Sequence, residues 1–119
     1  MDCLFCKIID GTIPSKTIYE SENVIAFLDI NPKECGHTLV VPKKHIKDIY
    51  ELDDANTLKE ECEKVATIIN EKLNPTGIMF VTNTGSLQEI KHLHIHLIPE
   101  YNEKLNLNVE EVYNKIKED

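Results

Sequence analysis

Three histidines that alternate with aliphatic residues carry the clearest chemical signal in the sequence. They are His92, His94 and His96, in the segment HLHIHLIP. On a β-strand alternate side chains share a face, so this spacing places three imidazoles on one face, roughly 6.6 Å apart. The aliphatic side chains between them point to the other face. A row of imidazoles on one face can line a cleft, where it could carry out catalysis or bind a metal ion.

Two interpretations other than catalysis are possible for this row. The histidines could occupy an ordinary polar sheet face. In that case three of the five histidines in the chain would share one face at strand spacing by accident. They could also bind a metal ion. Neighbouring imidazoles on one straight strand are too far apart for all three to reach one ion at about 2.1 Å.

The apolar side of the histidine strand needs a partner to pack on. The strict alternation predicts a strand over Lys91–Pro99, and the only sizeable partner is a long amphipathic helix. Asp53 and Asp54 are candidates for the N-cap of this helix, and Asn74-Pro75 ends it. Its apolar stripe steps by threes and fours and consists of Ala55, Leu58, Cys62, Val65, Ala66, Ile69 and Leu73. The histidines then lie on the sheet face opposite this helix, where they can line a cleft.

The other elements follow from shorter patterns. The sequence predicts a helical turn at 4–10, a hairpin of strands at 17–20 and 23–30, and further strands at 36–42 and 78–83. It also predicts a turn or single helical turn at 45–52 and a short helix at 109–116. The fold class is therefore α+β, with an antiparallel sheet of about five strands and one long helix on one face.

Composition restricts the function classes. The 119 residues include 13 lysines and 21 acidic residues, with no arginine, and the net charge is −8. Such a chain is a poor candidate for binding long nucleic acids. No apolar run approaches the ~20 residues of a membrane span, and the N-terminus lacks a signal pattern. We therefore expect a cytoplasmic protein whose four cysteines are reduced.

The sequence resembles the histidine-triad (HIT) family of nucleotide hydrolases and transferases. Residues 92–98 match every position of the family's His-φ-His-φ-His-φ-φ motif, where φ is apolar. Residues 3–14, 24–31, 36–45 and 81–85 look like the other landmark segments of the family, in the same order. The resemblance implies one HIT-like domain over residues 1–119.

The resemblance also implies roles for the residues around the phosphate. His94 would be the nucleophile that forms a nucleotidyl-histidine intermediate, with a backbone carbonyl accepting from its Nδ1. His96 would donate a hydrogen bond to the phosphate, and Asn83 would contact the phosphate or the leaving group, although it could also be a simple turn residue. The loop 83–91 is about two residues shorter than usual. Glu100 stands where the family often has an arginine, which removes one cation near the cleft.

A second set of residues matches the nucleoside site of the family. Asp29 would accept hydrogen bonds from both ribose hydroxyls, although it could instead cap the turn at Asn31-Pro32. The base pocket would be lined by Phe5, Ile8, Leu28 and Ile30, each of which could equally be a core residue. Gln88 keeps the glutamine of the phosphate loop.

Cys3-x-x-Cys6 raises the question of a metal. Two residues before the motif leave no room for the strand that a thioredoxin-like site requires, and a zinc half-site needs two further ligands. Some family members bind zinc through such a pair, and the resemblance then implies structural zinc on Cys3, Cys6, His45 and His92. The alternative is two buried thiols and a surface histidine. His37 is expected to be structural.

The resemblance implies an enzyme that hydrolyses purine nucleoside 5′-phosphoramidates and forms a homodimer. A second enzymatic possibility is cleavage of dinucleoside polyphosphates, or nucleotidyl transfer, by the same histidine. A possibility from another class is a zinc-stabilised adaptor that binds nucleotides without significant turnover. The leaving group distinguishes the two enzymatic possibilities, and the sequence does not specify it.

Overall fold

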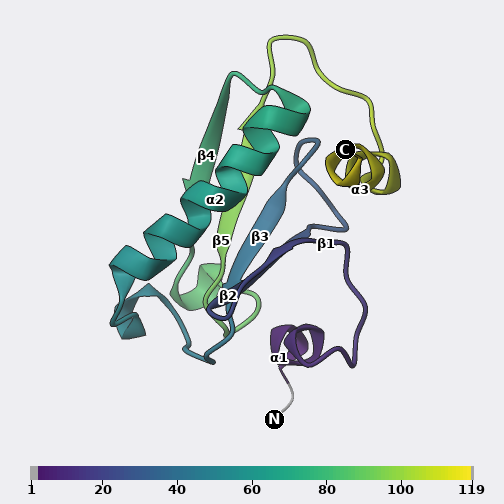
Figure 1. The fold of residues 1–119 in the computed structure, drawn as a ribbon. Helices are drawn as coiled ribbons and strands as arrows, with labels where there is room; N and C mark the ends of the chain where they lie inside the picture. Colours follow the sequence, from purple (N-terminus) through teal and green to yellow (C-terminus); the bar gives the residue numbers. More distant parts are fainter. Residues whose placement is uncertain (1–2, 119) are drawn as a thin grey trace.

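Five antiparallel strands form a single sheet in the order β1-β2-β3-β5-β4 (Figure 1). The computed structural model describes residues 3–118. The strands are β1 Thr17–Glu20, β2 Val24–Leu28, β3 Thr38–Pro42, β4 Gly77–Val81 and β5 Ile95–Glu100, and the helices are α1 Leu4–Ile9, α2 Ala55–Leu73 and α3 Val109–Lys117, with 3₁₀ turns η1 Ile49–Glu51 and η2 Gly85–Leu87. This architecture confirms the α+β prediction. None of the described helices is long and apolar enough to cross a membrane.

Helix α2 lies across one face of the sheet (Figure 1). The Asp54 side chain accepts a hydrogen bond from Thr57 N and caps the start of the helix, and Asn74 ends it in the left-handed conformation. The predicted apolar stripe is buried against the sheet, except that Ala55 is exposed. Glu61 is also buried on this side, where its carboxylate accepts hydrogen bonds from Tyr19 and Ser21. These bonds tie α2 to the β1–β2 hairpin.

The opposite face of the sheet is partly covered by the short helix α1. Phe5 of α1 packs in a buried cluster with Ile25, Phe27, Leu39 and Val41. Strand β2 is therefore buried on both faces, because its alternate residues Val24, Ala26 and Leu28 pack under α2. This arrangement explains why the β2 sequence is apolar throughout rather than alternating.

The histidine segment is shorter as a strand than the sequence predicts. The expected strand over Lys91–Pro99 begins only at Ile95. Before Ile95 the backbone groups bond to partners outside the strands: Leu93 N donates to Ile46 O at 2.8 Å, and Thr82 Oγ1 donates to His94 O at 3.0 Å. The expected strand at 78–83 likewise ends at Val81. The alternation itself is kept, because the aliphatic residues at 93, 95 and 97 all pack in the α2 cluster.

Gly36 starts the β3 segment at a crowded position. Its φ is +85°, and a Cβ on it would lie 2.5 Å from Leu73 Cδ1 of α2. We expect Gly36→Ala to lower the free energy of unfolding by about 2–4 kcal/mol, since it combines left-handed strain with overpacking. Urea denaturation measures this loss. Gly11→Ala is the matched control, since its φ is +86° but nothing lies within 4 Å. Equal losses in the two variants would show that crowding at Gly36 is unimportant.

Candidate active site

His94 is held with one nitrogen free. Its Nδ1 lies 2.8 Å from the carbonyl oxygen of His92. A carbonyl only accepts, so Nδ1 carries a proton, and in the neutral ring Nε2 keeps its lone pair. The half-buried His94 ring packs edge-to-face against the rings of Phe5 and His96, and the ring centroids are 4.9 Å apart in both pairs. His94 is therefore a fixed imidazole with a nucleophilic nitrogen.

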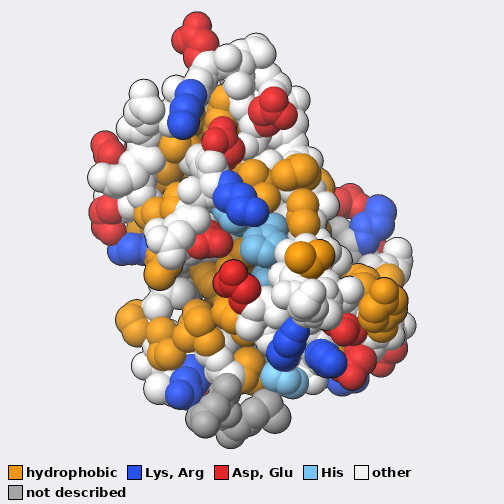
Figure 2. Space-filling model, turned by 180° about the vertical axis from the view of Figure 1, so that it is seen from behind, with side chains coloured by type: hydrophobic (Ala, Val, Ile, Leu, Met, Phe, Trp, Pro, Cys, Tyr) orange, Lys and Arg blue, Asp and Glu red, His pale blue; other side chains and the backbone are white. Residues whose placement is uncertain are grey.

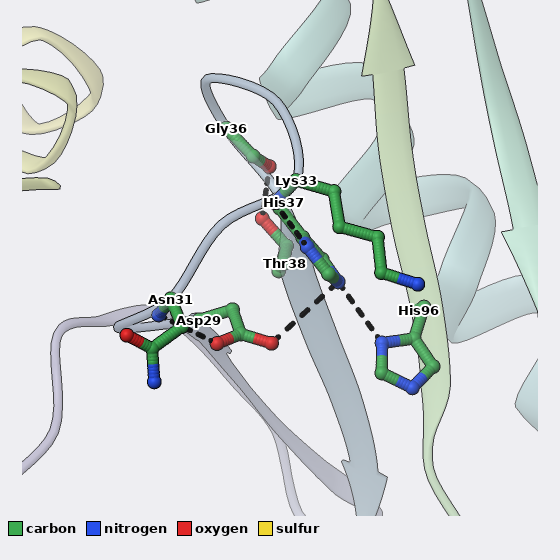
Figure 3. Close-up of polar contacts among 7 residues, drawn as sticks. All are labelled: Asp29, Asn31, Lys33, Gly36, His37, Thr38 and His96. Carbon is green, nitrogen blue, oxygen red and sulfur yellow. Dashed lines mark hydrogen bonds and ion pairs between the residues drawn. The ribbon is translucent and has the colours of Figure 1, made fainter. Parts of the chain in front are cut away.

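His96 is held in the opposite sense by a chain of hydrogen bonds (Figure 3). The backbone N–H of Lys33 donates to His37 Nδ1 at 3.1 Å, so the His37 proton is on Nε2. That nitrogen lies 2.9 Å from His96 Nδ1 and donates to it. The remaining His96 nitrogen, Nε2, must then carry a proton. The site thus pairs a bare nitrogen on His94 with an N–H donor on His96.

His37, which the sequence predicts to be structural, lies at the centre of this hydrogen-bond chain. Its side chain is almost completely buried and connects Asp29 to His96, with Asp29 Oδ2 3.7 Å from its Nε2. The two histidines are 59 residues apart, and they meet because β3 pairs with β5 in the register Leu39 to His96. No local pattern reports that pairing, although the position of His37 two residues before Leu39 fits the same sheet face.

Burial keeps the rings of His37 and His96 neutral. It lowers the pKa of His96 to about 4, with the neighbouring His94 and His37 rings adding to the effect. Burial likewise lowers the pKa of His37, and the Asp29 carboxylate opposes this only in part. At neutral pH each ring therefore holds one proton, which the hydrogen-bond chain requires.

The lowered pKa of His96 predicts a pH dependence of stability. Histidine in an unfolded chain titrates near pH 6.5, so between about pH 6.5 and 4 the unfolded state binds more protons than the folded state. We expect the free energy of unfolding to fall as pH is lowered through that window. Urea denaturation from pH 7.5 to 4.5 should show a smaller fall in His96→Gln than in the wild type. Identical pH slopes for both proteins would contradict this.

Asp29, His37 and His96 also bring three potential metal-ligand atoms within 4.8 Å of one another. Coordination through His37 Nε2 would move the proton of that ring to Nδ1. Two N–H donors, His37 Nδ1 and the backbone nitrogen of Lys33, would then face each other at 3.1 Å. The tautomers of His37 and His96 therefore favour a hydrogen-bonded chain, rather than a metal site, for this cluster with Asp29.

The Asp29 carboxylate uses one oxygen in a turn and leaves the other partly accessible. Its Oδ1 accepts from Asn31 N at 2.9 Å and so caps the turn after β2. The other oxygen points toward His37 (Figure 3), and the side chain is partly accessible. One carboxylate oxygen thus remains available for a sugar hydroxyl.

The four apolar residues predicted to surround a base are not brought together as one pocket. Phe5 is buried beside the His94 ring, and Ile8 is half-buried at the edge of the same cluster. Ile30 is 78% exposed, and Leu28 packs on the other side of the sheet, under α2. Phe27 is the β2 residue on the Phe5 side, with ring centroids 5.6 Å apart.

The two polar residues predicted near the phosphate are placed differently from each other. Asn83 is half-buried two residues after the end of β4, and its side chain makes no hydrogen bond within residues 3–118. Gln88 is buried, and its Nε2 donates to Lys47 O at 2.6 Å. Its Oε1 is buried without a partner in the described part of the chain. Gln88 therefore holds its loop against the 45–52 segment.

The four predicted metal ligands converge at the start of α1. Cys3 Sγ lies 3.3 Å and Cys6 Sγ 3.6 Å from His92 Nδ1, and Cys6 Sγ lies 3.2 Å from His45 Nδ1. All four ligand atoms lie within 4.8 Å of one another. Ligands around a tetrahedral zinc ion, with bonds of about 2.3 Å to sulfur and about 2.0–2.1 Å to nitrogen, have similar separations.

The surroundings of His92 also suit a metal ligand. Its Nε2 donates to Pro42 O at 2.8 Å, which leaves Nδ1 unprotonated and facing the thiols. Such an outer hydrogen bond commonly orients histidine ligands in metal sites. Two thiolates and two imidazoles form a closed, four-ligand set of the structural type.

Figure 2 shows the face of the molecule away from α2, with histidine side chains near its centre and hydrophobic and charged groups around them. His94 and His96 are both partly accessible, and they alternate with Leu93, Ile95 and Leu97, which pack in the α2 cluster on the other face of the sheet. The metal-ligand cluster lies beside these two histidines, because His92 is only two residues from His94.

Comparisons with known proteins agree with this geometry. The HIT domain family model matches residues 10–103. A HIT-like protein of Methanocaldococcus jannaschii is 43% identical over 97% of this chain and 98% of its own. The adenosine 5′-monophosphoramidase hnt1 of Schizosaccharomyces pombe is 36% identical over 92% of this chain and 82% of its own.

A solved structure of a zinc-bound histidine triad family protein from Mycobacterium smegmatis superposes with a TM-score of 0.85. It is 31% identical and covers 98% of this chain and 91% of its own. The matching segments, the sheet order and the converging histidines therefore lead to one conclusion: this chain belongs to the HIT family.

Proposed function

We propose that this protein hydrolyses purine nucleoside 5′-phosphoramidates through a covalent nucleotidyl-histidine intermediate. The observation that carries the proposal is the opposite protonation of two adjacent rings, with His94 Nε2 bare and His96 Nε2 protonated. A relative that is 36% identical is named as an adenosine 5′-monophosphoramidase, which supports the same reaction type.

The reaction then proceeds in two displacements. His94 Nε2 attacks the α-phosphorus and forms a P–N bond, while the P–N bond to the substrate's amine breaks. His96 Nε2 donates a hydrogen bond to a phosphate oxygen and stabilises the charge that develops there, while the departing nitrogen takes its proton from solvent and leaves as the free amine. In the second step water attacks the phosphorus, the bond to His94 breaks, and the proton that the water loses goes to solvent. The products are the nucleoside monophosphate and the free amine, and two easier steps replace one difficult step.

The remaining residues bind and orient the nucleotide. Asp29 receives a ribose hydroxyl on the carboxylate oxygen that is not used in the turn, and Asn83 contacts the phosphate or leaving group. Ile8 and Ile30 supply accessible apolar surface for the base, and a purine covers more of it than a pyrimidine. We expect AMP to bind more tightly than 2′-deoxy-AMP, and equal affinities in calorimetry would remove the ribose role of Asp29.

The test of the proposed function is release of AMP from adenosine 5′-phosphoramidate, compared with cleavage of diadenosine polyphosphates. A higher kcat/KM for the phosphoramidate is the expected result. A higher value for the diadenosine substrate would instead identify a dinucleoside polyphosphate hydrolase. Binding of AMP without turnover of either substrate would favour the adaptor function.

Zinc is the metal that the Cys3, Cys6, His45 and His92 cluster would hold. It would supply a structural link, with no open coordination position, between the start of α1, the segment after β3 and the residues before β5. The donor set and the outer hydrogen bond of His92 support this assignment.

The exposed edge of the sheet supports a homodimer. Strand β4 is at the edge, and its Met79 and Phe80 are 57% and 50% exposed. Phe80 also borders an apolar groove beside α2 that includes Ile49 and Leu58. An uncovered apolar edge strand is a favourable site for pairing with another copy.

Disruption of this edge tests the dimer. We expect Phe80→Lys to convert a dimer into monomers, measured by sedimentation equilibrium, because it places a charge in the apolar contact. Leu87→Lys is the control, since Leu87 is 73% exposed and lies outside the groove. A monomeric wild type, or a Phe80→Lys protein that stays dimeric, would reject this interface.

A further inference from the structure

Lys33 has a second contact with the active site that is independent of its backbone. Its N–H donates to His37, but its side chain runs past that ring and ends beside His96 (Figure 3). Within residues 3–118 no carboxylate lies within 4.0 Å of its ammonium group, whereas five other lysines form ion pairs with acidic residues. The positive charge of Lys33 is therefore not neutralised by a neighbouring acid.

The position of this ammonium beside the histidines (Figure 3) distinguishes it from the other lysines that form no ion pair. The chain has a net charge of −8 and no arginine, and Glu100 is the last residue of β5. The positive charge of Lys33 adds to the effect of burial in lowering the pKa of both His37 and His96. A cation thus stands next to the N–H donor in a protein that is otherwise acidic.

The position of the ammonium relative to Asp29 assigns it to one end of the substrate. The Asp29 carboxylate and the Lys33 ammonium lie on opposite sides of His37 (Figure 3). A nucleotide with its ribose at Asp29 and its α-phosphate at His94 and His96 would extend its leaving group toward Lys33. Lys33 would then face the leaving group, and Asp29 the ribose.

We propose that Lys33 is a specificity-determining residue that selects nucleotides whose leaving group carries an anionic substituent, such as a carboxylate or phosphate. This inference rests on the proposed function and names its substrate class: phosphoramidates of acidic amines rather than of simple amines. An exposed ion pair contributes modestly, so the expected preference is about fivefold.

A contact of Lys33 with the α-phosphate itself makes a different prediction. Every substrate carries that phosphate, so removal of the ammonium would then lower kcat/KM equally for all of them. The leaving-group assignment requires that only the substrate with the additional anion be affected.

The experiment uses two adenosine 5′-phosphoramidates that differ in one group: the amine is tryptophan, with a free carboxylate, or tryptamine, without one. Lys33→Met removes the charge at similar length and keeps the backbone N–H that fixes His37. Lys115→Met is the matched control, because Lys115 is an exposed lysine on α3. The measurement is kcat/KM for both substrates at low and high ionic strength.

We expect the wild type and Lys115→Met to prefer the tryptophan substrate by about fivefold at low salt, and less at high salt because exposed charges are screened. Lys33→Met should lose this preference and keep its activity on the tryptamine substrate. An unchanged substrate ratio in Lys33→Met, or equal losses on both substrates, would overturn the inference.

A binding measurement decides the case in which neither compound is hydrolysed and the proposed function fails. ADP places its β-phosphate where a leaving group would lie, so calorimetry compares ADP with AMP on both proteins. A fall of about fivefold in the ADP-to-AMP affinity ratio on Lys33→Met would support the inference. An unchanged ratio would overturn it.

Discussion

Replacing His94 with alanine is expected to reduce kcat on adenosine 5′-phosphoramidate by at least about 10⁴-fold, because it removes the attacking nitrogen. AMP affinity should change by less than about threefold, since the sugar and base contacts come from other elements. The measurements are steady-state hydrolysis and calorimetric titration of AMP. His94→Gly with added imidazole is a useful companion, because a free imidazole can occupy the vacated space and restore part of the rate.

The stereochemistry at phosphorus is an independent check on the same role. Two in-line displacements give overall retention at a chiral α-phosphorus, whereas direct attack by water gives inversion. Wild-type enzyme quenched during turnover should also carry labelled AMP on His94. Inversion, or a His94→Ala protein that keeps its rate, would exclude His94 as the nucleophile.

Removal of zinc is expected to have the second-largest effect. Purified protein should contain about one zinc per chain, and a strong chelator should lower the free energy of unfolding by at least about 3 kcal/mol, because an ion that binds only the folded state stabilises it by mass action. Elemental analysis and thermal melts with and without chelator measure this. Cys3→Ser should reproduce the loss, and Cys35→Ser is the control, since its Sγ contacts Leu105 O and Leu107 O outside the cluster.

The metal should also affect catalysis, because His92 has two functions. Its ring belongs to the ligand cluster, and its carbonyl accepts the hydrogen bond from His94 Nδ1. Loss of the ion should loosen that carbonyl and lower kcat in the protein that remains folded. Zinc-free protein with full stability and full activity would refute the proposed metal site.

The sequence by itself determined the features that depend on local periodicity. The alternation at 92–98 predicted a histidine face and an aliphatic face, and Leu93 and Leu97 do pack under the helix. The stripe and the caps predicted α2 almost to its ends, with Asp54 and Asn74 as boundaries. These signals are readable because helix and strand periods are properties of neighbouring residues.

Only the tertiary structure decided which residues meet across the sheet. The pairing of β3 with β5 brings His37 to His96, and the β2 register places Phe27 rather than Leu28 on the side of Phe5. Strand register is chosen by the packing of both faces at once, and a shift of one residue exchanges them.

The protonation of the site was likewise decided by tertiary contacts. The proton on His94 is placed by its contact with the His92 carbonyl, and the proton on His96 is placed by a backbone N–H 63 residues earlier, at Lys33, acting through His37. A histidine motif specifies the ring but not which nitrogen holds the proton. That choice depends on the donor or acceptor that the fold places beside each ring.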